Sequence, residues 1–216
     1  MKWLVLTLCA SSVVSAADIV PMEKGTAWTY RGEVAWAGDG DQVKRAKVQW
    51  KMEVVDSQRQ GRYRVARLMG YPSDLTFYQP DRQRGCHLLI AVDVKLYLTG
   101  CPAGDTALTG IDFSKLTNDD LILELPLEKG NTFAADSQRD DTMYAWHVED
   151  VGPAKVAGIA GVRPDFHGRQ YDLIYRTLPD HQIAIWVPGL GLTSYIYSHH
   201  GTASQVDIRL IEFQHP

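Results

Sequence analysis

The sequence predicts an all-β fold: an antiparallel curved sheet, arranged as an open barrel or a sandwich and built from two tandem related halves with one short connector helix. Two observations lead to this prediction. Apolar and polar residues alternate with a period of two through much of the 216-residue chain, which is typical of strands with one buried face. In addition, one short phrase occurs twice, half a chain apart. No segment keeps the 3.6-residue period of a long helix.

The repeated phrase indicates where each half begins. Residues 21–28 read PMEKGTAW, and residues 126–133 read PLEKGNTF, 105 positions later. Four positions are identical, and the Met/Leu and Trp/Phe pairs keep their character. We interpret the phrase as the start of a duplicated β-unit.

Two looser echoes extend the comparison. WKME at 50–53 resembles WHVE at 146–149, and Tyr63 with Pro72 resembles Tyr171 with Pro179. The halves are therefore expected at about 18–111 and 121–216, inside a single fused domain over 18–216. The stretch 112–120 between them is the best helical candidate, because Asp112 can cap it, and it is the predicted connector.

Strands are expected wherever alternation is clear. The clearest segments are 46–54, 144–149, 171–176, 183–187 and 206–210. Clusters of Gly, Pro and Asp separate the segments, as at 38–41 and 188–191. Pro188-Gly189 suits a tight turn, because Pro presets φ and Gly accepts a positive φ. The chain is therefore expected to form about ten antiparallel strands.

The N-terminus predicts export. Lys2, the apolar stretch 3–14 and the small residues at 14–17 have the form of a signal peptide over residues 1–17. The apolar stretch is too short to span a bilayer. The mature protein is therefore expected to be periplasmic or secreted, without a transmembrane segment.

Export also predicts a disulfide between Cys86 and Cys101, the cysteines that remain after cleavage. The apolar stretches 87–92 and 95–99 flank Asp93-Val94 and can form a hairpin about it. Paired positions in that hairpin sum to 187, so Cys86 falls opposite Cys101. The alternative is two free buried thiols.

The charge pattern disfavours two classes of partner. The chain has 22 Lys and Arg against 26 Asp and Glu, a net charge of −4, and its cations are scattered. Nucleic acids and anionic membrane surfaces are bound by clustered cations. Neither is expected as a partner, and the oligomeric state is left open.

The chain resembles bacterial exported proteins of uncharacterised families. Those proteins carry Pro-Leu-x-x-Gly-x-x-Trp at the start of a β-unit and an aromatic-x-Pro-Gly-Val-Gly-x-Val-x-Tyr segment near its end. Here the motifs correspond to 21–28, 126–133 and 186–195, with departures at Leu190 and Thr193. The resemblance implies a curved antiparallel sheet, similar to the half barrels of periplasmic lipid and lipoprotein carriers. It brings no established catalytic residue.

The segment 178–202 holds the candidate ligand-binding residues, which are Trp186, Tyr195, Tyr197 and His199. Trp186 alternates with the apolar Ile185 and Val187, so we expect it at a surface contact or on a concave second face. On the next strand the two tyrosines and His199 share one face. Exposed aromatic residues can line a site for an apolar ligand. The alternative is that they fill the core, as aromatics in β-proteins do.

The same segment holds candidate metal ligands, which are Asp180, His181, His199 and His200. Successive strand residues point to opposite faces, so His199 and His200 cannot easily ligate one ion. A site would need His181, or residues of the other half such as His147 and Glu149. The missing ligand spacing favours a polar hairpin end with hydrogen-bonded imidazoles, and no cofactor is expected.

The sequence contains no catalytic motif. The chain lacks Gly-x-Ser-x-Gly, His-Glu-x-x-His and a glycine-rich phosphate loop. The sequence therefore favours an exported, non-catalytic β-module that binds an apolar ligand, an envelope component or a partner protein. Two alternatives stay open. One is a metal-assisted hydrolase or related envelope enzyme that uses the His181/His199/His200 region, and the other is a structural component of an envelope assembly.

Overall fold

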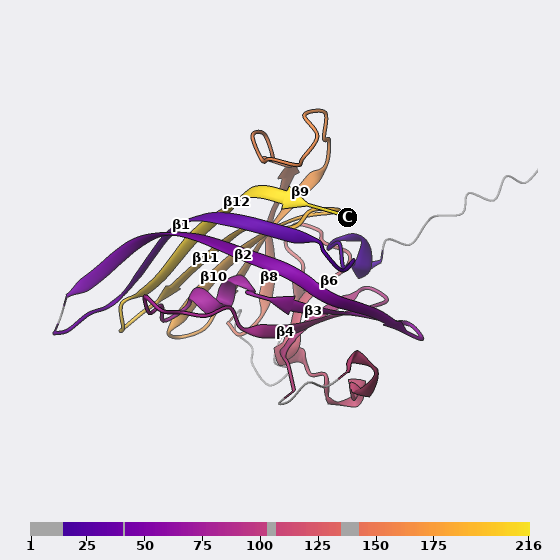
Figure 1. The fold of residues 1–216 in the computed structure, drawn as a ribbon, viewed down its shortest axis with the longest axis horizontal. Coiled ribbons are helices and arrows are strands. Elements are labelled where there is room, and N and C mark those ends of the chain that lie inside the picture. Colours follow the sequence, from indigo (N-terminus) through magenta and orange to yellow (C-terminus); the bar gives the residue numbers. More distant parts are fainter. Residues whose placement is uncertain (1–14, 41, 103–106, 135–142) are drawn as a thin grey trace, which may run out of the picture.

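One antiparallel sheet forms the body of the protein (Figure 1). The computed structural model describes residues 15–40, 42–102, 107–134 and 143–216, and these residues form twelve strands. The strands are β1 (Ala27–Ala37), β2 (Val43–Gln60), β3 (Tyr63–Met69), β4 (Cys86–Val92), β5 (Lys95–Gly100), β6 (Leu121–Glu124), β7 (Thr132–Phe133), β8 (Trp146–Pro153), β9 (Arg169–Arg176), β10 (Asp180–Val187), β11 (Gly191–His199) and β12 (Ser204–Gln214). The prediction of an all-β, antiparallel fold is confirmed.

Short 3-10 turns are the only helical elements in these residues. They are η1 (Ala16–Asp18), η2 (Pro72–Leu75), η3 (Leu108–Gly110), η4 (Phe113–Lys115) and η5 (Asn118–Asp120). The stretch 112–120, expected as a connector helix, holds η4 and η5. Asp112 caps η4, because its carboxylate accepts a hydrogen bond of 3.1 Å from the backbone N–H of Ser114. Residues 1–14, with most of the predicted signal peptide, lie outside the described residues. No helix of the described ranges is long and apolar enough to cross a membrane.

The strand order shows where the sheet is open. The order is β6-β5-β4-β3-β2-β1-β12-β11-β10-β9-β8-β7, and every pair is antiparallel. β1 and β12 pair in the middle, from Ala27 to Trp36 on β1. β6 and β7 follow each other in sequence but lie at opposite edges of the sheet. The sheet curves into a nearly closed barrel (Figure 1), and we call the region between its two edge strands, β6 and β7, the seam.

Aromatic side chains fill the interior of the curved sheet. Trp28, Tyr30 and Trp186 are each at most 2% exposed. Trp28 donates its indole N–H to the backbone oxygen of Leu190, and Tyr30 donates its hydroxyl to the backbone oxygen of Leu192 at 2.8 Å. These bonds satisfy buried polar atoms that would otherwise destabilise the core. They also join the first strand to the last third of the chain, so both halves share one core.

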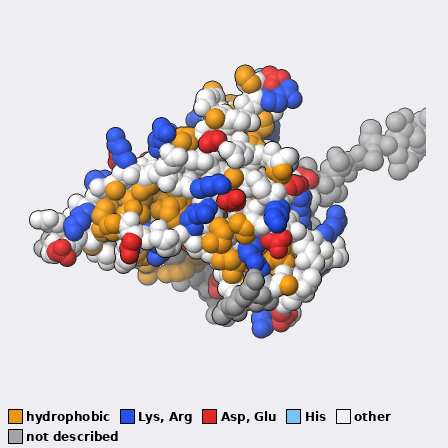
Figure 2. Space-filling model, in the orientation of Figure 1, with side chains coloured by type: hydrophobic (Ala, Val, Ile, Leu, Met, Phe, Trp, Pro, Cys, Tyr) orange, Lys and Arg blue, Asp and Glu red, His pale blue; other side chains and the backbone are white. Residues whose placement is uncertain are grey.

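Charged side chains of both signs intermingle on the outer face seen in Figure 2. Ion pairs at the surface of the sheet include Lys51 with Glu53 at 2.8 Å along β2 and Lys95 with Glu124 at 3.3 Å between β5 and β6. Solvent-exposed pairs of this kind contribute at most about 1 kcal/mol each. The stability of the fold therefore depends mainly on the packed interior.

The N-terminal segment covers one end of that interior. Ala16, Ile19 and Met22 are each at most 2% exposed. The backbone N–H groups of Gly189 and Gly191 each donate to the oxygen of Ile19 at 3.1 Å. The segment is therefore fixed to the β10–β11 turn.

The η2 loop covers the other end. Tyr71 packs against Tyr195 with ring centroids 6.5 Å apart. The backbone N–H of Phe77 donates to the hydroxyl of Ser204 at 2.8 Å, at the start of β12. The interior is therefore closed off at both ends of the barrel by segments of the chain itself.

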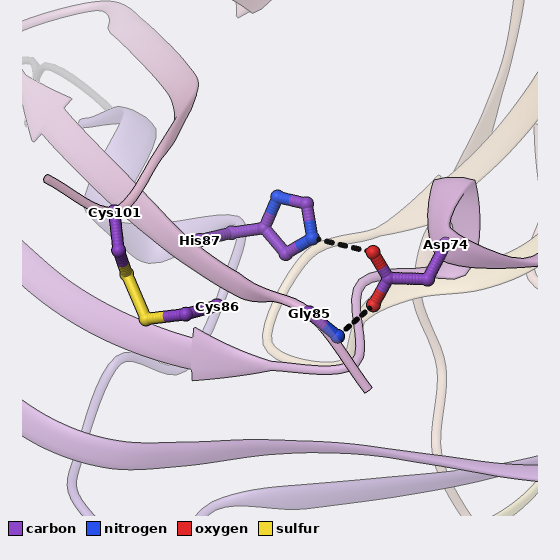
Figure 3. The surroundings of a disulfide bond; sticks show 5 residues. All are labelled: Asp74, Gly85, Cys86, His87 and Cys101. Atoms are coloured by element: carbon purple, nitrogen blue, oxygen red, sulfur yellow. Dashed lines mark hydrogen bonds and ion pairs between the residues drawn. A yellow bond between two sulfur atoms is a disulfide. The ribbon is translucent and has the colours of Figure 1, made fainter. Parts of the chain in front are cut away.

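The β4–β5 hairpin has the predicted register. His87 pairs with Gly100 and Leu89 with Leu98, so paired positions sum to 187. Cys86 and Cys101 form a disulfide with their Cα atoms 5.5 Å apart (Figure 3). The predicted disulfide is confirmed, and it closes the open end of the hairpin.

The two copies of the repeated phrase make the same backbone hydrogen bonds. Gly25 donates to the oxygen of Val54 at 2.9 Å, and Gly130 donates to the oxygen of Val148 at 2.8 Å. Both glycines have a positive φ, +93° and +90°, which glycine adopts without steric cost. A β-bulge then follows each valine, before Asp56 in β2 and before Asp150 in β8. Val54 and Val148 therefore occupy equivalent places in the two halves.

This equivalence corrects the two looser sequence echoes. Trp146 pairs with the last residue of the second phrase, and Met52 pairs with the last residue of the first. Trp146 therefore corresponds to Met52, two residues after Trp50, which the echo had matched to it. On the following strand, Tyr171 corresponds to Ala66 and not to Tyr63. The matching letters at these places were coincidental.

Candidate ligand pocket at the seam

A pocket of about 560 Å³ lies beside the seam. Five parts of the chain form its wall: the N-terminal segment, the β4–β5 turn, the connection from β6 to β7, the start of β9, and the β10–β11 turn. The lining residues are Ile19, Val94, Leu125, Pro126, Leu127, Glu128, Arg169, Tyr171 and Pro188. Volumes of this size are typical of small-molecule sites.

The connection between the edge strands supplies much of the apolar lining. Leu125 donates its backbone N–H to the oxygen of Val94 at 2.9 Å, which fixes the connection against the β4–β5 turn. Leu127 is 6% exposed and belongs to the main core. β6 and β7 do not pair with each other, so this connection runs from one edge of the sheet to the other. The pocket is thus lined in part by the connection that crosses the seam.

Two opposite charges border this apolar surface. Arg169 is the first residue of β9, and Glu128 lies in the turn before β7. Both are exposed, and neither forms an ion pair within the described ranges. Predominantly apolar walls with a few polar groups are the usual composition of a site for an apolar or amphiphilic molecule.

Trp186, predicted to lie at a surface contact or on a concave second face, is in the core at 2% exposure. The interior lies on the side of Ala184 and Trp186, while Ile183 and Ile185 are half-buried on the outer side. The expectation of a surface contact is therefore wrong. The apolar residues on the outer face of β10 made that face resemble the core face.

The other three predicted ligand-binding residues lie near the η2 end, away from the seam pocket. Tyr195 is 2% exposed, and burial raises its pKa well above the usual value. Tyr197 donates its hydroxyl to Asp180 at 2.6 Å, and desolvation together with this carboxylate raises its pKa. The His199 ring packs on Phe77 with centroids 5.2 Å apart. Tyr195, Tyr197 and His199 also make ring contacts with Tyr71 and Phe77, on either side of η2, and so pack this loop against β11.

The four proposed metal ligands are not gathered into one site. Within the described residues, no three His, Cys, Asp or Glu side chains are placed to hold an ion. Asp180 is engaged by a tyrosine hydroxyl, and His199 accepts a hydrogen bond of 3.2 Å from the backbone of Thr202. The backbone N–H of His200 donates to the oxygen of the proline at 179. Desolvation lowers the pKa of His181, whose Nε2 is buried and has no hydrogen-bond partner among the described residues.

One pair of titratable side chains was not predicted from the sequence. Asp74 in η2 places one carboxylate oxygen 2.9 Å from Nε2 of His87 in β4 (Figure 3). Its other oxygen accepts the backbone N–H of Gly85 at 2.7 Å. The pair therefore ties the η2 loop to the strand that carries Cys86. Thirteen residues separate the two side chains in sequence, and no motif spacing connects them.

The seam pocket was also missed, because its wall combines distant segments. One signal was available: Glu128 belongs to the second copy of the repeated phrase. Within the sequence, the phrase indicates duplication and does not indicate a pocket. Its position at the edge of the sheet depends on the topology, which the sequence pattern does not reveal.

Comparisons with known proteins show distant similarity only. No protein-family model matches the chain, and no curated protein matches it significantly. A Bacteroides fragilis protein with inferred export and a YmcC-like fold is 14% identical, with a TM-score of 0.43 over 91% of this chain and 99% of that one. A Parabacteroides distasonis protein, inferred to be a lipoprotein, is 12% identical, with a TM-score of 0.38 over 91% and 98% of the two chains. The function is therefore argued from this chain's own residues.

Proposed function

We propose that this chain is an exported, non-catalytic β-module that binds a small apolar or amphiphilic molecule in the seam pocket. The observation that supports the proposal is the apolar pocket at the gap between the edge strands. Burial of apolar ligand surface there contributes about 25 cal/mol per Å² removed from water. Pocket shape and a few polar groups then determine which molecule is bound.

The pocket is a better candidate than the barrel interior. Trp28, Tyr30 and Trp186 fill that interior, and both of its ends are covered. A ligand inside the barrel would have to displace close-packed side chains, which costs about the stability that they contribute. A ligand at the seam displaces only water and covers side chains such as Val94 and Leu125.

A pocket-filling substitution tests this function. Val94 is half-buried and lines the pocket, and its hydrogen bond with Leu125 uses only the backbone oxygen. Val94→Trp is expected to occupy the space, so that the affinity for the neutral dye N-phenyl-1-naphthylamine falls at least about tenfold, which corresponds to about 1.4 kcal/mol. The measurement is fluorescence titration of purified protein.

Val43→Trp is the matched control. Val43 is 53% exposed on the β1–β2 hairpin and does not line the pocket. This variant is expected to bind the dye like the unsubstituted protein. Equal dye binding by all three proteins, or no binding by any of them, would refute the proposed function.

A further inference from the structure

The first half of the molecule contains an ion pair that the second half lacks. Glu23, in the first repeated phrase, contacts the guanidinium of Arg64 at the start of β3. Partial burial acts to raise the pKa of Glu23, but the hydrogen bond with Arg64, a backbone hydrogen bond, the charge of the guanidinium and the hydrogen bond with His215 together lower that pKa. Both side chains are partly shielded, 40% and 33% exposed. In this half, the arginine is neutralised by a carboxylate of the chain itself.

The same two residue types occupy the equivalent places of the second half. Glu128 corresponds to Glu23 in the repeated phrase. Arg169 corresponds to Arg64 in the strand register. Between β2 and β3, the pair that contains Arg64 is the fourth after the pair that contains Val54. Between β8 and β9, the pair that contains Arg169 is likewise the fourth after the pair that contains Val148. The second half therefore has the residues of an ion pair in the corresponding positions.

The two residues of the second half nevertheless do not form an ion pair with each other. Glu128 and Arg169 both line the seam pocket, and neither makes a side-chain hydrogen bond or ion pair with another described residue. Tyr171 lines the pocket where the first half has the small, fully buried Ala66. The first half neutralises its cation internally, whereas the cation of the second half lies beside an apolar surface and has no ionic partner in the part of the chain that the structure describes.

We propose that Arg169 binds the anionic group, carboxylate or phosphate, of a single-chain amphiphile whose hydrocarbon tail occupies the apolar part of the seam pocket. This inference rests on the proposed function and adds the class of head group. A guanidinium binds carboxylate and phosphate oxygens through two parallel hydrogen bonds. The ligand's anion would take the place that the glutamate has in the first half. Glu128, at the same mouth, repels that anion and weakens its binding.

Head-group and tail contributions can be separated with three ten-carbon ligands. Decanoate, decyl phosphate and decanol share one tail and differ in the head group. Each would be titrated, below its micelle concentration, against protein loaded with N-phenyl-1-naphthylamine. Arg169→Gln is expected to lower the affinity for both anions at least about tenfold, which is the effect of losing a charged hydrogen bond. The affinity for decanol is expected to stay unchanged. Glu128→Gln is expected to raise the affinity for both anions several-fold, because it removes the repelling carboxylate.

Arg31→Gln provides the matched control. Arg31 is exposed on β1, and its loss changes the net charge by the same amount. It is expected to leave all three affinities unchanged, and thermal unfolding would verify that every variant is folded. If Arg169→Gln lowers the affinity for only one of the two anions, the proposal still holds. The natural ligand then carries the head group of that anion, carboxylate or phosphate.

The outcomes distinguish this inference from the function on which it rests. If the unsubstituted protein takes up neither dye nor ligand, both are refuted. If it binds all three ligands alike, and Arg169→Gln changes nothing or weakens all three equally, the pocket is confirmed and the anionic head group is refuted.

Discussion

At the scale of single residues, one glycine sets the distance between the two halves. Gly32 lies in β1, which pairs with β12 on one side and β2 on the other. A Cβ added there would stand 1.8 Å from the backbone oxygen of Asp207. A non-glycine residue would therefore force apart the two central strands of the sheet. Gly32 does not have a positive φ, so its backbone conformation does not require glycine. Glycine is needed here because the backbone of β12 leaves no room for a Cβ atom.

Gly32→Ala is expected to lower the free energy of unfolding by about 2 kcal/mol or more, as overpacking does in a well-packed site. Gly152→Ala is the control, because Gly152 is also in a strand, has an ordinary φ, and has open space within 4 Å of the point where a Cβ would stand. That variant is expected to be neutral or slightly stabilising. Urea denaturation measures both, and equal stability of the two variants would contradict the argument.

The candidate site also shows what single residues can reveal in advance. The types of the pocket residues carry no signal, because Leu, Pro and Val are common everywhere in the chain. Arg169 becomes informative only when it is set beside Arg64, and that comparison needs the strand register. The predicted aromatic and histidine residues were conspicuous by type, but they stabilise the core and the η2 loop.

At the scale of elements, sequence periodicity predicted hairpins well. The β4–β5 register and its disulfide were both predicted, because a two-residue turn fixes every pair in the hairpin. The bulges in β2 and β8 could not be predicted, since an extra residue changes the register without changing the alternation pattern visibly. The two looser echoes failed for another reason, because the connections between strands differ in length: Val54 lies 29 positions after Gly25, whereas Val148 lies 18 positions after Gly130.

The disulfide gives a test at this scale. Removing it with Cys86→Ala and Cys101→Ala together is expected to lower the free energy of unfolding by about 3 kcal/mol, because the closed loop of about 15 residues restricts the unfolded chain. Urea denaturation with and without a reductant measures the effect. The reductant should destabilise the unsubstituted protein by the same amount and leave the double variant unchanged. A reductant effect on the double variant would show that the loss has another cause.

At the scale of the whole molecule, the topology places the first and last strands, β1 and β12, in the middle of the sheet and a mid-chain connection at its edges. His215 lies 3.1 Å from Glu23, so the end of the chain is next to the start of the first unit. The β6–β7 connection, by contrast, crosses the seam and lines the pocket. The two boundaries between the parts of the chain therefore differ: β1 and β12 pair directly, whereas β6 and β7 do not pair with each other.

The shared core gives the last expected outcome. Fragments 18–111 and 121–216 are joined only through the stretch 112–120, but the bonds from Trp28 to Leu190 and from Tyr30 to Leu192 cross between them. Each fragment alone would expose half of that core and is expected to remain unfolded. Coexpressed, they are expected to copurify and to recover the near-UV circular dichroism of the intact chain, because β1 can still pair with β12 and β5 with β6. Cooperative unfolding of either isolated fragment would show two independent domains and would remove the physical basis for a pocket formed jointly by both halves.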